Sequence, residues 1–201
     1  MYDHNQSQKD IIMNTLHYIQ IFADCQAIEN DPKVAPSEAI HMYCNPAILW
    51  KDQQGYMTTN GSYELGIKVN RDDEIRWQVF PQVALPPHAS EPYSVIISAR
   101  HDWEEPTALL RDWAAHQGHQ SIYVYGSDDV SMSQDADVSI KRVTGYAPYV
   151  SARATFPDRP NPGALSSTEA YKFWIDIYKG NSSTPIVKDY GWDPYVTIQE
   201  P

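Results

Sequence analysis

The chain has 201 residues, 42% of them hydrophobic and 20% charged, a globular composition within the size range of one all-β domain. Its 15 basic and 26 acidic residues give a net charge of −11, which argues against nucleic acid or an anionic membrane surface as a partner. The 15 prolines and 6 tryptophans favour a loop-rich β protein over a helical bundle.

Residues 1–13 are polar and predict a flexible leader, followed by a single domain over 14–201. The leader lacks the basic and apolar regions of a secretory signal peptide, and no apolar run reaches membrane-spanning length. A cytoplasmic protein is therefore expected. In a reducing compartment Cys25 and Cys44 are expected to be free thiols, although neighbouring strands could bring them together.

The first half of the chain predicts strands, because apolar and polar residues alternate with a period of two. Two strands are expected at 15–24 and 40–44. After an Asn-Gly turn signal, the alternation over 62–69, and again over 75–80, predicts a β-hairpin with one buried face.

The second half of the chain predicts one helix among further strands. Within 106–116, the apolar residues Leu109, Leu110, Trp113 and Ala114 have helical spacing, and a glycine follows as a stop signal. The remaining alternating segments predict strands at 93–99, 121–125, 138–143 and 150–156, and a C-terminal hairpin of 171–178 and 188–198.

Many short strands separated by turn residues are typical of a β-sandwich. We predict an all-β fold, a sandwich of about eight to ten antiparallel strands, with one short helical insertion at about 101–145. The insertion is expected either to carry the binding properties that distinguish this protein or to cover an exposed sheet edge. The predicted core residues are Ile21, Tyr63, Leu65, Ile67, Ile75, Trp77, Val95, Ile97, Phe173, Ile175 and Ile177.

Five short motifs occur in a fixed order along the chain: IQIFAD at 19–24, YCN at 43–45, DDEIRW at 72–77, YSVII at 93–97 and YGWDPY at 190–195. Their order resembles the PixA/AidA family of bacterial inclusion-body proteins. The resemblance implies a β-sandwich that is made abundantly in bacteria and is sometimes deposited as intracellular inclusions. It implies no catalytic residue.

Two pairs of neighbouring residues place an indole beside a carboxylate: Trp192 with Asp193, and Trp103 with Asp102. A sugar stacks on an indole and hydrogen-bonds to a carboxylate, so these residue types suit a glycan or another small molecule. The competing interpretation of Trp192 and Asp193 is structural, with the tryptophan packed at the sheet end and the aspartate in a turn.

Four carboxylates lie within ten residues, at Asp128, Asp129, Asp135 and Asp137. Such a loop could enclose a hard cation such as Ca²⁺, but the pattern favours a solvated acidic loop, because blocks of like charge usually face water. His116 and His119, with His101 earlier, offer too few ligands at metal-site spacing, and His116 is expected at a helix end. No other cofactor is expected.

The sequence leaves three classes of function open. The resemblance favours a non-catalytic inclusion-body protein. The many tyrosines and tryptophans of the chain, residues that favour interfaces, predict a homo-oligomer. A lectin-like glycan-binding module is the second class. The third is a hydrolase assembled from dispersed residues, because the sequence contains no P-loop, nucleophile elbow or local triad.

Overall fold

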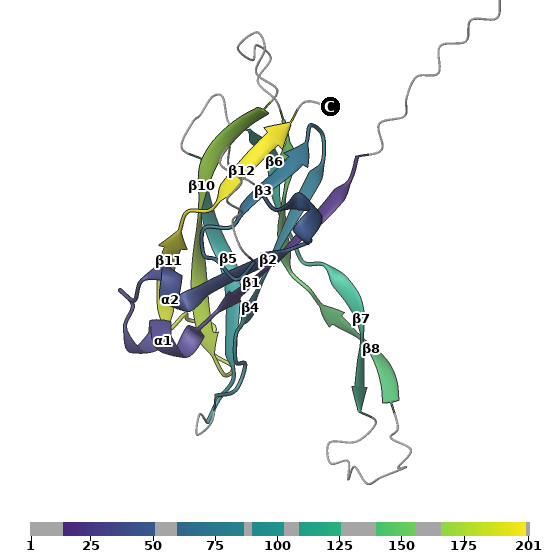
Figure 1. Cartoon of the computed structure of the whole chain (residues 1–201). Helices are drawn as coiled ribbons and strands as arrows, with labels where there is room; N and C mark the ends of the chain where they lie inside the picture. Colours follow the sequence, from purple (N-terminus) through teal and green to yellow (C-terminus); the bar gives the residue numbers. More distant parts are fainter. Residues whose placement is uncertain are drawn as a thin grey trace, which may run out of the picture.

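The computed structural model describes residues 14–50, 60–86, 90–102, 109–125, 140–155 and 166–199. Most of these residues lie in two stacked β-sheets, and a two-stranded ribbon projects beyond them (Figure 1). The predicted all-β class is confirmed. The described residues form twelve strands where eight to ten were predicted, partly because the second arm of the C-terminal hairpin is split in two.

The first sheet has the strand order β2-β1-β4-β9-β6. Its neighbours pair antiparallel except β1 and β4, which run parallel. The strands are β1 (Leu16–Ala23), β2 (Ile40–Cys44), β4 (Glu74–Pro81), β6 (Leu110–His116) and β9 (Tyr149–Ala154).

The second sheet is built around its longest strand, β10 (Ser166–Lys179), which pairs with β5 (Tyr93–Asp102) on one side. On the other side it pairs with β11 (Val187–Trp192) and β12 (Tyr195–Gln199), in a register that is shared by the two strands and shifts only at an irregularity between Ile175 and Ile177. The predicted C-terminal hairpin is therefore confirmed, with a break in its second arm at 193–194. The edge strand β3 (Gly66–Asn70) runs parallel to β12.

The predicted hairpin of 62–69 and 75–80 is wrong, because β3 and β4 belong to different sheets. The chain turns at Asp72, which has a φ of 69°, and crosses from one sheet to the other. A strand with one buried face alternates in the same way whether its neighbour in sequence lies beside it or in the facing sheet. The sandwich also contains two parallel pairs, β1 with β4 and β12 with β3, which the predicted antiparallel sandwich lacks.

The predicted helix at 106–116 is also wrong over its described part, which forms the edge strand β6. A β-bulge lies between Arg111 and Ala114, and Asp112 adopts a left-handed φ of 57°. The extra residue lets Leu110 and Trp113, three positions apart, both face the interior. The bulge thus imitates the apolar spacing of a helix.

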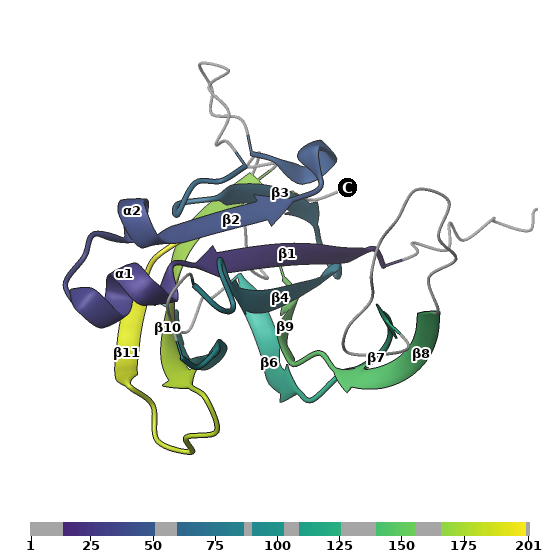
Figure 2. The same cartoon turned by 90° about the horizontal axis from the view of Figure 1, so that it is seen from below.

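The observed helices are short and lie elsewhere: α1 (Cys25–Asn30), α2 (Pro36–Ala39) and the 3-10 turn η1 (Pro46–Ile48). Figures 1 and 2 both place α1 and α2 at the end of the molecule beside β11. None of the helices in the described ranges is long and apolar enough to cross a membrane.

The core lies between the sheets and contains the predicted residues, of which Tyr63 and Ile97 are only partly buried. At its centre the indole N–H of Trp77 donates to the Tyr171 hydroxyl oxygen at 3.0 Å. Burial raises the pKa of Tyr171, so this phenol stays neutral. One hydrogen bond thereby joins β4 of the first sheet to β10 of the second.

Helix α1 is held to the second sheet by Glu29. Its carboxylate accepts hydrogen bonds from the Lys179 ammonium, at 2.9 Å to each oxygen, and from the Tyr93 hydroxyl. The Tyr93 hydrogen bond and then Lys179 hold the pKa of Glu29 below its usual value of 4.5. The three side chains thus connect α1 to β5 and β10.

We expect the substitution Glu29→Gln to destabilise the fold by about 1 kcal/mol near neutral pH, a modest effect because the group is partly exposed. A carboxyl whose pKa is lowered in the folded state stabilises that state above its unfolded pKa, and the contribution disappears as the pH falls through the folded pKa. Urea unfolding at about pH 7 and about pH 3 measures this. An undiminished difference at the acidic pH would contradict the assignment.

Candidate functional site

A two-stranded ribbon extends the edge of the first sheet. Strands β7 (His119–Tyr125) and β8 (Ile140–Tyr146) pair over seven positions and continue β6 and β9 outward. Figures 1 and 2 both show the ribbon standing clear of the two sheets. Part of the predicted insertion at 101–145 is therefore sheet and part is a projecting arm.

The ribbon leaves the sheet at a narrow hinge. Gly118 has a φ of 51°, and the Ala147 N–H donates to its carbonyl oxygen at 3.1 Å. A Cβ atom on Gly118 would lie 2.1 Å from the Ala147 carbonyl oxygen, so only glycine fits. The direction of the ribbon is thus fixed by the backbone at its base.

The ribbon exposes apolar and basic side chains. Ile140 is 63% exposed and Tyr146 is 69% exposed, large fractions for such residues. Lys141 and Arg142 are exposed beside them, and the two strands contain no acidic residue. The two strands themselves therefore carry positive charge, whereas the sequence that joins them carries Asp128, Asp129, Asp135 and Asp137.

A row of stacked side chains crosses the outer face of the first sheet at the base of the ribbon. The His116 and Tyr149 rings stack at 4.5 Å, and the Arg76 guanidinium lies 4.7 Å from the Tyr149 ring centre. Arg76 also donates to Glu74 at 2.6 Å. Because both faces of Tyr149 are covered, this ring offers no open stacking surface.

The His116 Nε2 lies 2.9 Å from the Ser151 Oγ, the arrangement closest to a nucleophile and base among the described residues. A catalytic triad also needs a third group that orients the histidine. Among the described residues, His116 is bonded to Ser151 and stacked on Tyr149, and no carboxylate hydrogen-bonds to it. The pair therefore fixes the end of β6 against β9.

A cleft of about 160 Å³ opens on the opposite side of this edge, between β5 and β6. Trp77, Val95, Ile97 and Val150 line it, and Tyr149 borders it. The lining is mostly apolar. The sequence alone does not reveal this cleft, because its walls come from strands of both sheets, β4, β5, β6 and β9.

Trp192 is 1% exposed, so its ring does not face solvent as a sugar platform requires. Its indole N–H points to the Met42 sulfur at 3.3 Å, and its ring packs 5.8 Å from that of Phe173. Asp193 is exposed in the break between β11 and β12. Trp192 therefore has the packing position, and Asp193 the turn position, of the structural interpretation that competed with ligand binding.

The other predicted ligand residues are largely outside the described part of the chain. Asp102 ends β5, where its backbone pairs with Tyr171. Trp103 lies outside the described residues, and so do the proposed calcium ligands Asp128, Asp129, Asp135 and Asp137. The calcium site remains a prediction.

The three histidines are on strands. His116 ends β6, which corrects its predicted position at a helix end, His119 begins β7, and His101 lies near the end of β5. Across the described ranges, no group of three histidine, cysteine or acidic residues is placed to hold a metal ion.

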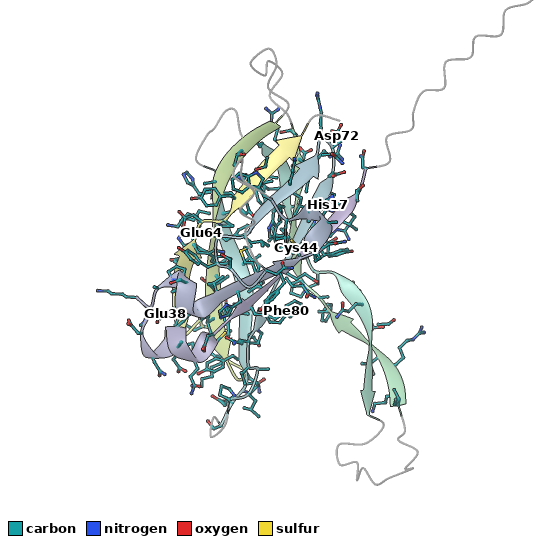
Figure 3. The ribbon with its side chains drawn as sticks, viewed as in Figure 1. His17, Glu38, Cys44, Glu64, Asp72 and Phe80 are labelled. Atoms are coloured by element: carbon teal, nitrogen blue, oxygen red, sulfur yellow. The ribbon has the colours of Figure 1, made fainter. Side chains whose placement is uncertain are left out.

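Both cysteines are free thiols, as predicted. Cys44 ends the edge strand β2 (Figure 3), and Cys25 begins α1. Burial raises the pKa of Cys25 to about 12 and that of Cys44 to about 11. Both are therefore protonated near neutral pH and unsuited to act as nucleophiles.

The two facing sheets define the chain as a β-sandwich protein. Among solved structures it is similar to the crystal structure of the inclusion body protein PixA from Burkholderia cenocepacia J2315. The two chains are 11% identical, with a TM-score of 0.48, over 94% of this chain and 97% of that one. The name PixA, which that structure carries, is also in the name of the family that the sequence motifs resemble. A scan against protein-family models and a search of curated proteins each found no match.

Proposed function

We propose that this chain is a non-catalytic bacterial protein of the PixA/AidA inclusion-body type, which accumulates in the cytoplasm and assembles with copies of itself. The five ordered sequence motifs support the family. The observation that carries the self-assembly is the β7–β8 ribbon, which stands clear of the body. The proposed interface is this ribbon against the body of a second copy.

A ribbon of two strands is marginally stable in water unless it packs against something else. The ribbon here pairs only within itself along seven positions, while Ile140 and Tyr146 are exposed. Docking would bury these apolar side chains and add contacts that the isolated chain lacks. The geometry at Gly118 favours docking because the ribbon is already held away from its own body.

A second copy of the chain suits the ribbon as a partner for reasons of charge and symmetry. The ribbon strands carry Lys141 and Arg142, whereas exposed acids such as Asp31 and Glu38 lie at the α1–α2 end of the body. Opposite charges steer association and fix its orientation. In a two-fold dimer each ribbon meets the other body, so the same contact forms twice.

The test removes the ribbon without disturbing the sandwich. His116 and Tyr149 are paired at the base, so residues 117–148 are replaced by Asn-Gly, which joins them as a tight hairpin. Light scattering after size exclusion is expected to give a dimer or larger assembly for the full chain and a monomer for the shortened one. Circular dichroism checks that the shortened chain keeps its strands.

A charge-matched pair of variants separates the interface from general charge effects. Lys141→Gln with Arg142→Gln is expected to weaken the assembly about tenfold or more, consistent with the loss of two interfacial charge pairs. Arg71→Gln with Arg111→Gln, which changes the net charge equally at exposed positions of the body away from the α1–α2 end, leaves it intact. A full chain that is monomeric at high concentration, or a shortened chain that keeps the oligomeric mass, contradicts the proposal.

The alternatives have less support. Of the residues behind the glycan-binding alternative, Trp192 is buried, whereas Trp103 and the four aspartates of the acidic loop lie outside the described residues. For a hydrolase, the described residues offer the pair of His116 and Ser151, and no carboxylate among them hydrogen-bonds to this histidine.

A further inference from the structure

The cleft between β5 and β6 exists because of one small residue. Trp113 on β6 fills the space between the sheets at one point, stacked 5.1 Å from Trp77 and covered on its outer side by the Arg100 guanidinium at 4.8 Å. Two positions further along β6, on the same side of the strand, stands Ala115. Its methyl group is too small to fill the space between the two sheets next to Trp113.

This unfilled space between the sheets is the cleft of about 160 Å³. Its walls come from both sheets, with Trp77 and Val150 on one side and Val95 and Ile97 on the other. Both strands that border it are sheet edges, so no further strand of the described chain closes it. An apolar cavity of about 150 Å³ is large enough to hold benzene.

The chemistry of the lining selects an uncharged molecule. The cleft is lined by no aspartate, glutamate, lysine or arginine, and His116 and Gln117 contribute the polar groups. A charged ligand would lose its hydration there without gaining an opposite charge. A flat ring is favoured because Trp77 and Tyr149 are among the lining residues, and the edge of an aromatic side chain packs well against the face of a bound ring.

We propose that the cleft between β5 and β6 is a binding site for a small neutral aromatic molecule of one or two rings, bounded by Trp77, Val95, Ile97, Ala115, Tyr149 and Val150. This inference is independent of the ribbon and of self-assembly.

The test uses indole as the probe and methyl NMR spectra of the full-length protein as the readout. Saturable shifts are expected for the methyl signals of Val95, Ile97 and Val150, while those of Ile28, a buried residue of α1, stay in place. Benzyl alcohol is expected to bind at least tenfold more tightly than benzoate, which carries the same ring with a charge. No saturable shift, shifts centred elsewhere, or equal binding of benzoate would overturn the proposal.

Two substitutions of alanine by leucine test whether the probe binds in this cleft. Ala115→Leu places a larger apolar side chain in the cleft at an exposed strand position that tolerates bulk, and is expected to weaken indole binding at least tenfold. Ala47→Leu adds the same atoms at an exposed position on η1 and is expected to leave binding unchanged. Equal binding by Ala115→Leu and the unmodified protein would overturn the assignment. Both variants keep the oligomeric mass, so failure here is distinguishable from failure of the self-assembly proposal.

Discussion

The substitution Trp77→Ala is expected to lower the free energy of unfolding by about 3–5 kcal/mol. Trp77 is fully buried, and its ring lies within 6 Å of Trp113, Tyr171 and Phe173. Removing the indole leaves a cavity between the sheets and takes the hydrogen-bond donor from the buried Tyr171 hydroxyl. Urea unfolding followed by circular dichroism measures the change.

Trp174→Ala serves as the matched control, because Trp174 also lies on a central strand, β10 of the second sheet, but is only half-buried. Its loss is expected to cost about 1–2 kcal/mol, in proportion to the smaller apolar area that it buries. If the two substitutions were equally destabilising, the cluster around Trp77 would not be the centre of the core.

The substitution Asp73→Ala is expected to destabilise the fold by about 3 kcal/mol. Asp73 is 3% exposed at the crossing between the sheets. Its carboxylate accepts hydrogen bonds from the backbone N–H groups of Thr15 and Asn70 and pairs with the His17 ring, each at 2.9 Å. Without it, two backbone donors at the crossing lose their partners.

Two further variants control this result. Asp73→Asn keeps an acceptor oxygen and is expected to recover part of the loss, whereas Glu74→Ala removes a partly exposed carboxylate paired with Arg76 and is expected to cost under about 1 kcal/mol. If Glu74→Ala destabilised the fold as strongly as is expected for Asp73→Ala, while Asp73→Ala had no effect, Glu74 rather than Asp73 would be the residue that anchors the crossing.

Strand positions were predictable because alternation depends on local burial alone. The strand that begins near Thr15 and the C-terminal hairpin are where the alternation placed them. Strand partners were not predictable, since β3 and β4 alternate identically whether they form a hairpin or cross between sheets. Asp73 was visible in a motif, but its role as the acceptor that anchors the crossing depends on contacts with distant residues.

The candidate sites were less predictable than the strands. Trp192 next to Asp193 carried the residue types of a sugar site, but sequence does not reveal which way a strand-end indole points, and here it points inward. The cleft depends on Ala115, an ordinary residue whose significance comes only from its opposite neighbours. One local feature marks the base of the ribbon: Gly118, which faces Ala147 at the point where the strand pair β6–β9 gives way to the pair β7–β8.

Hydrogen–deuterium exchange as a function of protein concentration tests most directly whether the ribbon docks on a second copy. A ribbon that stands alone opens easily and exchanges fast, and docking stabilises it by mass action. We predict that protection of the β7 and β8 amides rises with protein concentration, while that of the central strand β10 stays constant. Ribbon amides that exchange at the same rate at every concentration would contradict self-assembly through the ribbon.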